Sequence, residues 1–450
     1  MKNLFSILLI CTAKVSLSQS WPIAEIVDTV QTSVPDQSYA LYLPANYDEE
    51  KEYPVIFFFE PLARSTFPLN LYRDLADKYE FILTCSNNSR NFASALSSLD
   101  AADAIIKDVF SRFKVNQEMV IASGFSGGSR VSMAVATQFT AVRGVIGIGA
   151  VGPMYSQHKL QGAHQIPYVG LVGNRDFNYV EHYRGEQGLT EGGVDNIRLV
   201  YNRPHQWAPI NDYEMGLIWM MKKLSQNLAG GIVSQPFIDN YLQKISDSVS
   251  VLDAVRVKKY FESDFAVELL DLQVDKSLLA KKEKQLIKTI ELEEKLRQQY
   301  QDSLNLSFKL RPNRNLNSPL NWIINAGLSY KRKVDQNEKK HPNRAEMYDR
   351  MANFISGSAY EYSIQALMAK NYNQAYVAIE IWSSMVQNDR WENWMKCKLY
   401  AMNNDIPMAT RYLEKLIKSG FENGKALQAD SSFHVLRETK PYIELTSKDR

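Results

Sequence analysis

The chain of 450 residues has little cysteine, little histidine and almost no net charge, and each shortage excludes a class of protein. Three cysteines are too few for a disulfide framework, and we expect Cys85 and Cys397 to be buried free thiols. Six scattered histidines show no ligand spacing, so we predict no metal centre, and without a nucleotide-binding loop we predict no cofactor. A formal net charge of +2 gives no reason to expect binding to nucleic acid.

Long apolar runs are also missing beyond the N-terminus. No later stretch approaches the roughly 18 apolar residues of a membrane span. At the start of the chain, Lys2 precedes an apolar stretch at 4–10, and small residues follow at 16–18. This pattern is typical of a secretory signal. We therefore expect residues 1–20 to be removed and the protein to be exported, either to the periplasm or outside the cell.

Strand-like and helical runs alternate through the first half of the chain. Short apolar runs stand at 38–43, 53–59, 81–85, 118–122, 142–149, 168–173 and 197–201, and helical patterns stand at 71–78, 96–110, 130–136 and 211–227. Several of the short runs are continuously apolar, as in strands that are covered on both faces. The alternation predicts an α/β domain over residues 21–230, with a mostly parallel, doubly wound sheet.

The stretch Gly124-Phe125-Ser126-Gly127-Gly128 lies between a predicted strand and a predicted helix. In that context a G-x-S-x-G motif indicates a nucleophile elbow, a sharp turn that holds the serine hydroxyl clear of the sheet. The turn is too tight for side chains at Gly124 and Gly128. Ser126 is therefore the candidate nucleophile.

An acid and a histidine follow two later predicted strands. Asp176 comes after the run at 168–173, and His205 comes after the run at 197–201. Catalytic residues of doubly wound sheets lie beyond the carboxyl ends of the strands. Asp195 precedes its strand and would lie at the opposite edge, so we favour Asp176 as the partner of His205.

These residue types predict nucleophilic catalysis with defined roles. An imidazole at His205 would take the proton of the serine hydroxyl, and a carboxylate at Asp176 would orient the imidazole. The oxyanion needs two donors, for which we predict the backbone N–H groups of Gly127 and of Leu62 in the loop after residues 53–59; Ala63 is the alternative to Leu62. We also expect Phe125 and Trp207 to contact the substrate.

Residues 30–228 resemble the secreted bacterial α/β-hydrolases, in particular the feruloyl-esterase and polyhydroxybutyrate-depolymerase-like group, which is related to dienelactone hydrolases. The resemblance rests on the runs at 39–44 and 53–59, the stretch at 86–90, the motif at 124–130 and the His-x-Trp at 205–207. It implies hydrolysis of carboxylic esters through an acyl-serine intermediate at Ser126. Pro204 is a departure, because a glycine often precedes the histidine in this group.

The chain between Ser126 and His205 is mostly taken up by strands and their connections, which leaves no room for a large inserted lid. An open site suits bulky esters. We therefore expect a small-molecule or polymer-linked ester as substrate, such as an ester attached to a carbohydrate or to another exported polymer.

Past residue 231 the strand-like runs disappear. We predict a helical connector at 231–343 and an all-α domain at 344–450. In the latter, residues 371–376 match residues 404–409 at the 34-residue period of tetratricopeptide repeats. Such helix pairs would bind a protein partner or mediate self-association; the alternative is an appendage that packs on the first domain.

Two further functions remain open at this stage. The chain could be a non-catalytic scaffold that acts through its helical region. It could also be a serine peptidase, because acyl-serine chemistry cleaves amides as well as esters.

Overall fold

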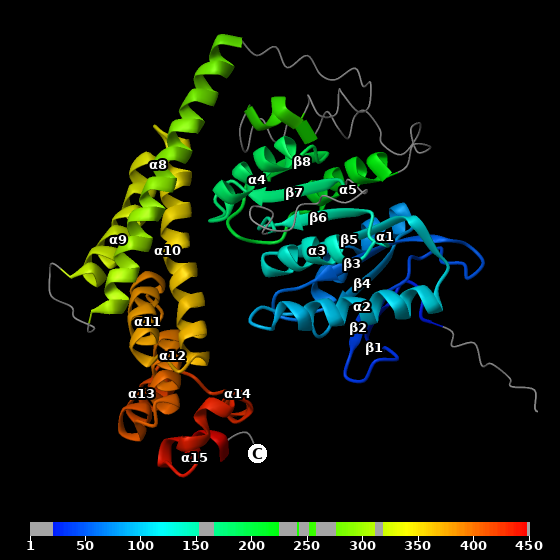
Figure 1. Cartoon of the computed structure of the whole chain (residues 1–450). Coiled ribbons are helices and arrows are strands. Elements are labelled where there is room, and N and C mark those ends of the chain that lie inside the picture. Colours follow the sequence, from blue (N-terminus) through cyan, green and yellow to red (C-terminus); the bar gives the residue numbers. More distant parts are fainter. Residues whose placement is uncertain are drawn as a thin grey trace, which may run out of the picture.

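The computed structural model describes residues 21–152, 166–224, 241–242, 252–257, 276–310 and 318–447. The predicted signal at residues 1–20 lies outside these ranges. The chain forms a sheet-containing part, followed by a long helical part that runs alongside it (Figure 1). Within the described residues, no helix is long and apolar enough to cross a membrane.

Eight strands form one sheet. They are β1 (Ile26–Gln31), β2 (Ser38–Tyr42), β3 (Tyr53–Phe59), β4 (Ile82–Ser86), β5 (Val115–Phe125), β6 (Gly144–Ile148), β7 (Tyr168–Gly173) and β8 (Asn196–Tyr201). Their order is β1-β2-β4-β3-β5-β6-β7-β8. Only the pairs β1–β2 and β2–β4 are antiparallel. The mostly parallel sheet predicted from the alternating pattern is confirmed.

Helices cover both faces of the sheet. They are α1 (Thr66–Tyr79), α2 (Ala95–Arg112), α3 (Gly127–Gln138), α4 (Tyr179–Glu191) and α5 (Ile210–Leu224). Buried side chains of α1 and α5 share one apolar cluster with one face of the sheet, and those of α2 and α3 share a second cluster with the other face. The sheet is therefore doubly wound, and its central strands are buried on both sides, which explains their continuously apolar sequences.

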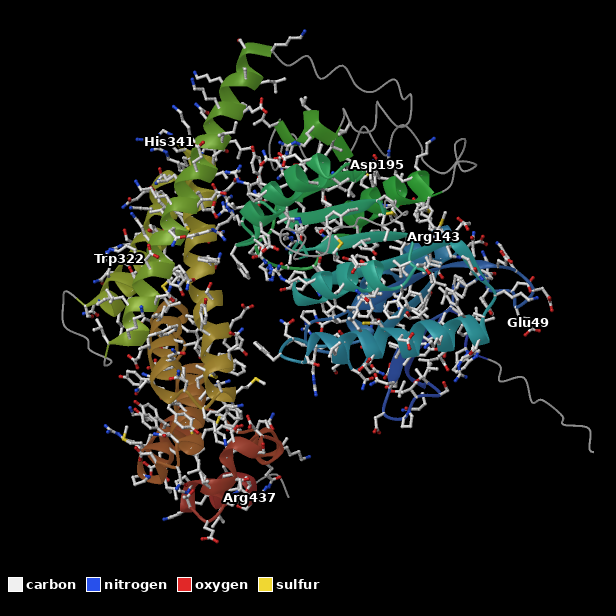
Figure 2. The ribbon with its side chains drawn as sticks, in the orientation of Figure 1. Glu49, Arg143, Asp195, Trp322, His341 and Arg437 are labelled. Carbon is white, nitrogen blue, oxygen red and sulfur yellow. The ribbon has the colours of Figure 1, made fainter. Side chains whose placement is uncertain are left out.

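The helical part contains α8 (Lys276–Lys309), α9 (Pro319–Asn337), α10 (Pro342–Met368), α11 (Tyr372–Val386), α12 (Asp389–Met402), α13 (Ile406–Lys418), α14 (Gly424–Ala429), the 3-10 helix η1 (Ser431–Leu436) and α15 (Lys440–Ser447). Helices α8 to α11 share one apolar cluster. The predicted boundary near residue 343 thus falls inside a packed unit. Trp322 near the start of α9 and His341 just before α10 lie on its side away from the sheet (Figure 2).

The two matching segments, which lie 34 residues apart at 371–376 and 404–409, occupy equivalent places at the starts of helices. The side chain of Asn371 accepts a hydrogen bond from the N–H of Gln374 at the start of α11, and Asp405 does the same for Met408 at the start of α13. These are N-caps, which satisfy N–H groups that the first helical turn leaves open. The tetratricopeptide-like character of the region stays a prediction.

The sheet-containing and helical parts are joined through α8 and α10. Ile290 of α8 packs with Val172, Val180 and other apolar residues of β7, α4 and β8. Beside it, the guanidinium of Arg350 on α10 donates to the carboxylate of Glu293 on α8 at 2.7 Å and to the backbone oxygen of Asn174 at 2.7 Å. Both charged side chains are almost fully buried. A paired buried charge fixes the docking geometry, because any shift would leave it unpaired.

Glu346 on α10 makes this junction sensitive to pH. Its Oε1 accepts from Nδ2 of Asn174 at 3.0 Å, and burial raises the pKa of its carboxyl to about 7. The folded protein therefore holds this proton more tightly than the unfolded chain. The resulting stabilisation of the folded protein is complete at a pH below the pKa that Glu346 has in the unfolded chain, and it is lost as the pH rises through about 7.

We expect Glu346→Gln to reduce the difference in unfolding free energy between pH 5 and pH 8 by up to about 3 kcal/mol. Urea unfolding of both proteins at the two pH values measures this difference. Glu438→Gln, which changes an exposed carboxylate, is the control. An unchanged difference in the Glu346 variant would contradict the prediction.

Candidate active site

The turn between β5 and α3 holds Ser126 in a strained conformation. Its φ is +54° and its ψ is −118°, a region that residues with a side chain rarely adopt. A β-carbon on Gly128 would lie 1.9 Å from the backbone oxygen of Phe59, and one on Gly124 would lie 2.5 Å from the backbone of Gly128. Only glycines allow β3, β5 and α3 to approach this closely, which is why the serine stands at a sharp turn.

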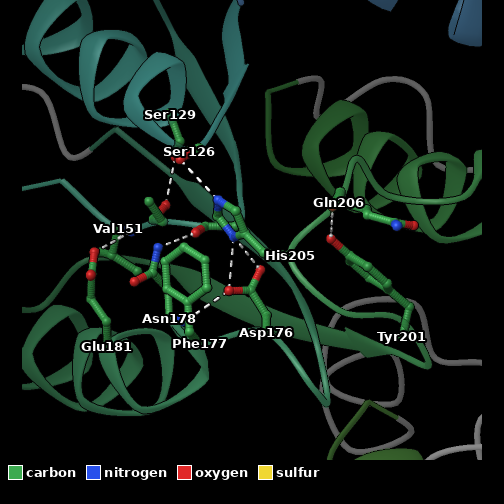
Figure 3. Close-up of polar contacts among 12 residues, drawn as sticks. Ser126, Ser129, Val151, Asp176, Phe177, Asn178, Glu181, Tyr201, His205 and Gln206 are labelled. Atoms are coloured by element: carbon green, nitrogen blue, oxygen red, sulfur yellow. Dashed lines mark hydrogen bonds and ion pairs between the residues drawn. The ribbon is translucent and has the colours of Figure 1, made fainter. Parts of the chain in front are cut away.

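Three side chains predicted to act together lie in one hydrogen-bonded chain (Figure 3). Nε2 of His205 is 3.0 Å from Oγ of Ser126. Nδ1 of the same ring is 2.9 Å from both carboxylate oxygens of Asp176. The three residues follow β5, β8 and β7, which are parallel strands that end at the same edge of the sheet.

The carboxylate of Asp176 is fully buried and is held from two sides. Besides the ring of His205, the backbone N–H of Asn178 donates to its Oδ1 at 2.7 Å. Asn178 in turn donates from Nδ2 to the backbone oxygen of Gly149 at 2.7 Å. The rejected alternative, Asp195, lies before β8 and pairs with Lys223 at 3.5 Å.

Two aromatic rings enclose the imidazole of His205. The ring centroid of Phe125 lies 4.6 Å from it, and that of Phe177 lies 4.2 Å from it. Phe125 is 8% exposed and packs on Trp207 at 5.5 Å. These contacts limit where the imidazole can move.

We predicted that Phe125 and Trp207 would contact the substrate, and the structure gives both a different place. Neither lines the cleft beside Ser126. Phe125 is buried against His205, and Trp207 packs on the apolar cluster that includes Phe58 and Tyr72. Phe125 therefore supports the imidazole of His205 directly, and the half-buried Trp207 packs behind Phe125. The cleft is lined by Phe177 and Asn178, which sequence reasoning had passed over although they directly follow Asp176.

The two predicted oxyanion donors, the backbone N–H groups of Gly127 and Leu62, differ in whether they already have an acceptor. Gly127 is the first residue of α3, and an N–H in the first turn has no acceptor within its own helix. By contrast, the N–H of Leu62 donates to Oε2 of Glu60 at 2.7 Å. Glu60 is fully buried and also accepts from the N–H of Arg64 at 3.0 Å. The structure therefore does not support Leu62 as the second donor, because a buried carboxylate already occupies its N–H.

A cleft with a volume of about 810 Å³ opens over Ser126. One wall comes from the sheet-containing part and includes Asn91, Gly127 and Phe177. The opposite wall is formed by α10, with further lining from Arg297 of α8; the α10 residues are Phe354, Gly357, Ser358, Glu361, Gln365 and Met368. The helical region therefore lines the candidate active site.

Most charged groups that line the cleft are paired. Arg130 on α3 meets Glu181 on α4 at 2.8 Å. The N–H of Val151 donates to the same carboxylate (Figure 3). Arg297 donates to Glu293 at 2.6 Å. Within the described residues, no cluster of histidine, cysteine, aspartate or glutamate is arranged to hold a metal ion. Cys85 and Cys397 are both buried and free, as predicted.

No protein-family model matches the chain, and no curated protein matches it. Solved structures similar to part of it include FphF, a fluorophosphonate-binding serine hydrolase of Staphylococcus aureus, at 13% identity and a TM-score of 0.37, covering 44% of this chain and 99% of that one. Esterase B from Lactobacillus Rhamnosis shows 13% identity and a TM-score of 0.37, over 46% of this chain and 89% of that one. The feruloyl esterase module of Clostridium thermocellum shows 13% identity and a TM-score of 0.36, over 42% of this chain and 84% of that one.

Proposed function

We propose that this protein is a serine hydrolase that cleaves carboxylic esters through an acyl-serine intermediate. The observation that carries the proposal is the chain Ser126–His205–Asp176 at the mouth of a cleft, with Ser126 on a strained turn. A structural serine would not need a conformation at φ +54° together with an imidazole at 3.0 Å.

The distances assign each group its step. Nε2 of His205 takes the proton of Ser126 Oγ as that oxygen attacks the ester carbonyl. The buried carboxylate of Asp176 keeps the proton of His205 on Nδ1 and stabilises the imidazolium. His205 then protonates the leaving alcohol, and a water molecule, deprotonated by the same ring, hydrolyses the acyl-serine. The N–H of Gly127 stabilises the negative charge on the tetrahedral oxygen.

We further propose that the substrate is a bulky ester, attached to a carbohydrate or to another polymer, that the protein meets after export. A cleft of about 810 Å³ is large enough for an aromatic acyl group together with part of its alcohol. The signal-like pattern at residues 1–20 supports export. We also propose that the C-terminal helices bind a protein partner or mediate self-association.

The test is hydrolysis of p-nitrophenyl acetate and methyl ferulate by the mature chain, together with labelling by a fluorophosphonate probe. Turnover with labelling at Ser126 supports the proposal. Peptide amides in the same panel distinguish an esterase from a peptidase. If the chain neither hydrolyses these esters nor is labelled by the probe, the proposed enzyme function is wrong and the non-catalytic scaffold is favoured.

The wall formed by α10 predicts a selective effect on large substrates. Gly357 faces Phe177 across the cleft, and a β-carbon there would lie 3.5 Å from the ring. A methyl group fits this space, but a longer side chain would project into the cleft. We therefore expect Gly357→Leu to lower kcat/KM for methyl ferulate by about tenfold or more, and to change that for p-nitrophenyl acetate much less.

Steady-state kinetics on the two esters measure this selectivity. Tyr360→Leu changes an exposed residue of the same helix that does not line the cleft, and it serves as the control. Equal losses on both substrates in the Gly357 variant would show that α10 does not limit substrate size.

A further inference from the structure

Both N–H groups that the sequence offered as oxyanion donors in the loop after β3, those of Leu62 and Ala63, are already engaged. Pro61 has none, and those of Leu62 and Arg64 donate to the carboxylate of Glu60. The N–H of Ala63 donates to the backbone oxygen of Glu60 at 3.1 Å. Because one N–H stabilises a tetrahedral oxyanion only in part, we searched the other elements beside Gly127 for a second donor.

Asn91 lies at that place. It follows β4, and its backbone N–H donates to the oxygen of Pro61 at 2.8 Å, so the loop locked by Glu60 also holds Asn91. Its side chain lies against Gly127: a β-carbon on Gly127 would lie 1.8 Å from Oδ1 and 3.3 Å from Nδ2 of Asn91. Asn91, Ser126 and Gly127 line the same cleft.

The amide of Asn91 is free to serve a ligand. Within the described residues, we find no hydrogen bond that engages its Oδ1 or Nδ2. Because nothing holds either end, a half-turn about the last side-chain bond exchanges the two atoms and brings the NH₂ group to the place beside Gly127 that Oδ1 occupies, in the cleft that Ser126 also lines. The next residue, Phe92, has a φ of +66°, a strained value for a bulky residue, and its side chain also lines the cleft.

We propose that Nδ2 of Asn91 is the second oxyanion donor and that Asn91 is a catalytic residue. The inference rests on the proposed function, since an oxyanion forms only if Ser126 attacks a carbonyl. It also accounts for glycine directly after the nucleophile. Any side chain at 127 would displace the amide of Asn91.

The test compares Asn91→Ala and Asn91→Asp with the wild-type chain on p-nitrophenyl acetate. We expect both variants to lower kcat by about a hundredfold to a thousandfold with little change in KM, because the donor acts mainly in the transition state. The alanine variant removes the donor without adding a charge and therefore isolates its contribution, whereas the aspartate variant keeps the shape but puts a negative charge beside the oxyanion and should lose at least as much. Ser94→Ala, which removes the N-cap of α2 in the same loop, should retain its activity.

A double-mutant cycle with Gly127→Ala sharpens the test. Gly127→Ala keeps its own N–H but displaces Asn91, so it should cause a similar loss alone and little more in the Asn91→Ala background. If wild-type turnover is normal and either Asn91 variant keeps more than a fifth of kcat, this inference is wrong and the proposed function stands. If the wild-type chain neither turns over esters nor labels at Ser126, both are wrong.

Discussion

Ser126→Ala is expected to lower kcat for p-nitrophenyl acetate by about a thousandfold or more and to abolish fluorophosphonate labelling. Oγ of Ser126 is the atom that Nε2 of His205 faces at 3.0 Å, and the ring is in turn held by the buried carboxylate of Asp176. Without the hydroxyl, the imidazole has no nucleophile to activate. The rest of the chain can supply only binding and electrostatic stabilisation.

A matched control is available on α3. The hydroxyl of Ser132 donates to the backbone oxygen of Gly128 at 2.9 Å and is buried, so Ser132→Ala removes a serine hydroxyl from the same helix without touching His205. We expect it to keep kcat within a few-fold of wild type. If Ser126→Ala retained wild-type turnover, the nucleophile would have to be another group.

Glu293→Gln is expected to destabilise the folded protein by about 3–5 kcal/mol. The carboxylate of Glu293 is fully buried and accepts from Arg350, which is itself 2% exposed, and from Arg297. Burial would lower the pKa of Arg350, and the charge of Glu293 counteracts this and raises it. The glutamine keeps the shape but leaves two guanidinium groups without the negative charge that offsets their burial.

The neighbouring Glu294 provides the comparison. It pairs with Arg184 at 2.7 Å, but its side chain is 37% exposed, so Glu294→Gln should cost no more than about 1 kcal/mol. Thermal unfolding of both variants measures the difference. We expect a drop of about 3–5 °C for Glu293→Gln, and equal melting temperatures for the two variants would contradict the buried-pair argument.

Glu293 joins α8 to Arg350 of α10 and also binds Arg297, which lines the cleft, so the same variant tests whether the site depends on the helical part. Arg350 also donates to the oxygen of Asn174, close to the loop that carries Asp176. We expect that Glu293→Gln lowers turnover of bulky esters more than that of p-nitrophenyl acetate, because the α10 wall would be less firmly placed.

Local patterns in the sequence were enough to predict the elements that carry the triad. The mostly apolar runs within β5, β7 and β8 predict strands, and the residue that follows each strand is placed by the strand itself. Parallel strands bring their carboxyl ends to one edge, so Ser126, Asp176 and His205 could be expected to meet without any distance being known. The glycines at 124 and 128 predicted the sharp turn that carries Ser126, because a side chain at either position would clash with the backbone.

Loop contacts could not be predicted in the same way. The expectation that Leu62 donates to an oxyanion depended on the loop after β3 having a free N–H, and a carboxylate two residues away, Glu60, takes it. Phe125 and Trp207 were expected at the substrate because they neighbour Ser126 and His205 in sequence. The hydrophobic effect instead buried the ring of Phe125 and packed the half-buried ring of Trp207 against the same core cluster.

By itself, the sequence determined the doubly wound sheet, the position of the strained serine turn and the edge at which an acid and a histidine join it, because these follow from periodicity and from strand direction. Only the tertiary structure decided that α10 forms the far wall of the cleft, that Arg350 and Glu293 bind the two parts together, and that the amide of Asn91 lies beside Gly127. The physical reason is that these contacts join residues far apart in the chain, and their energies depend on burial and distance, which no local pattern encodes.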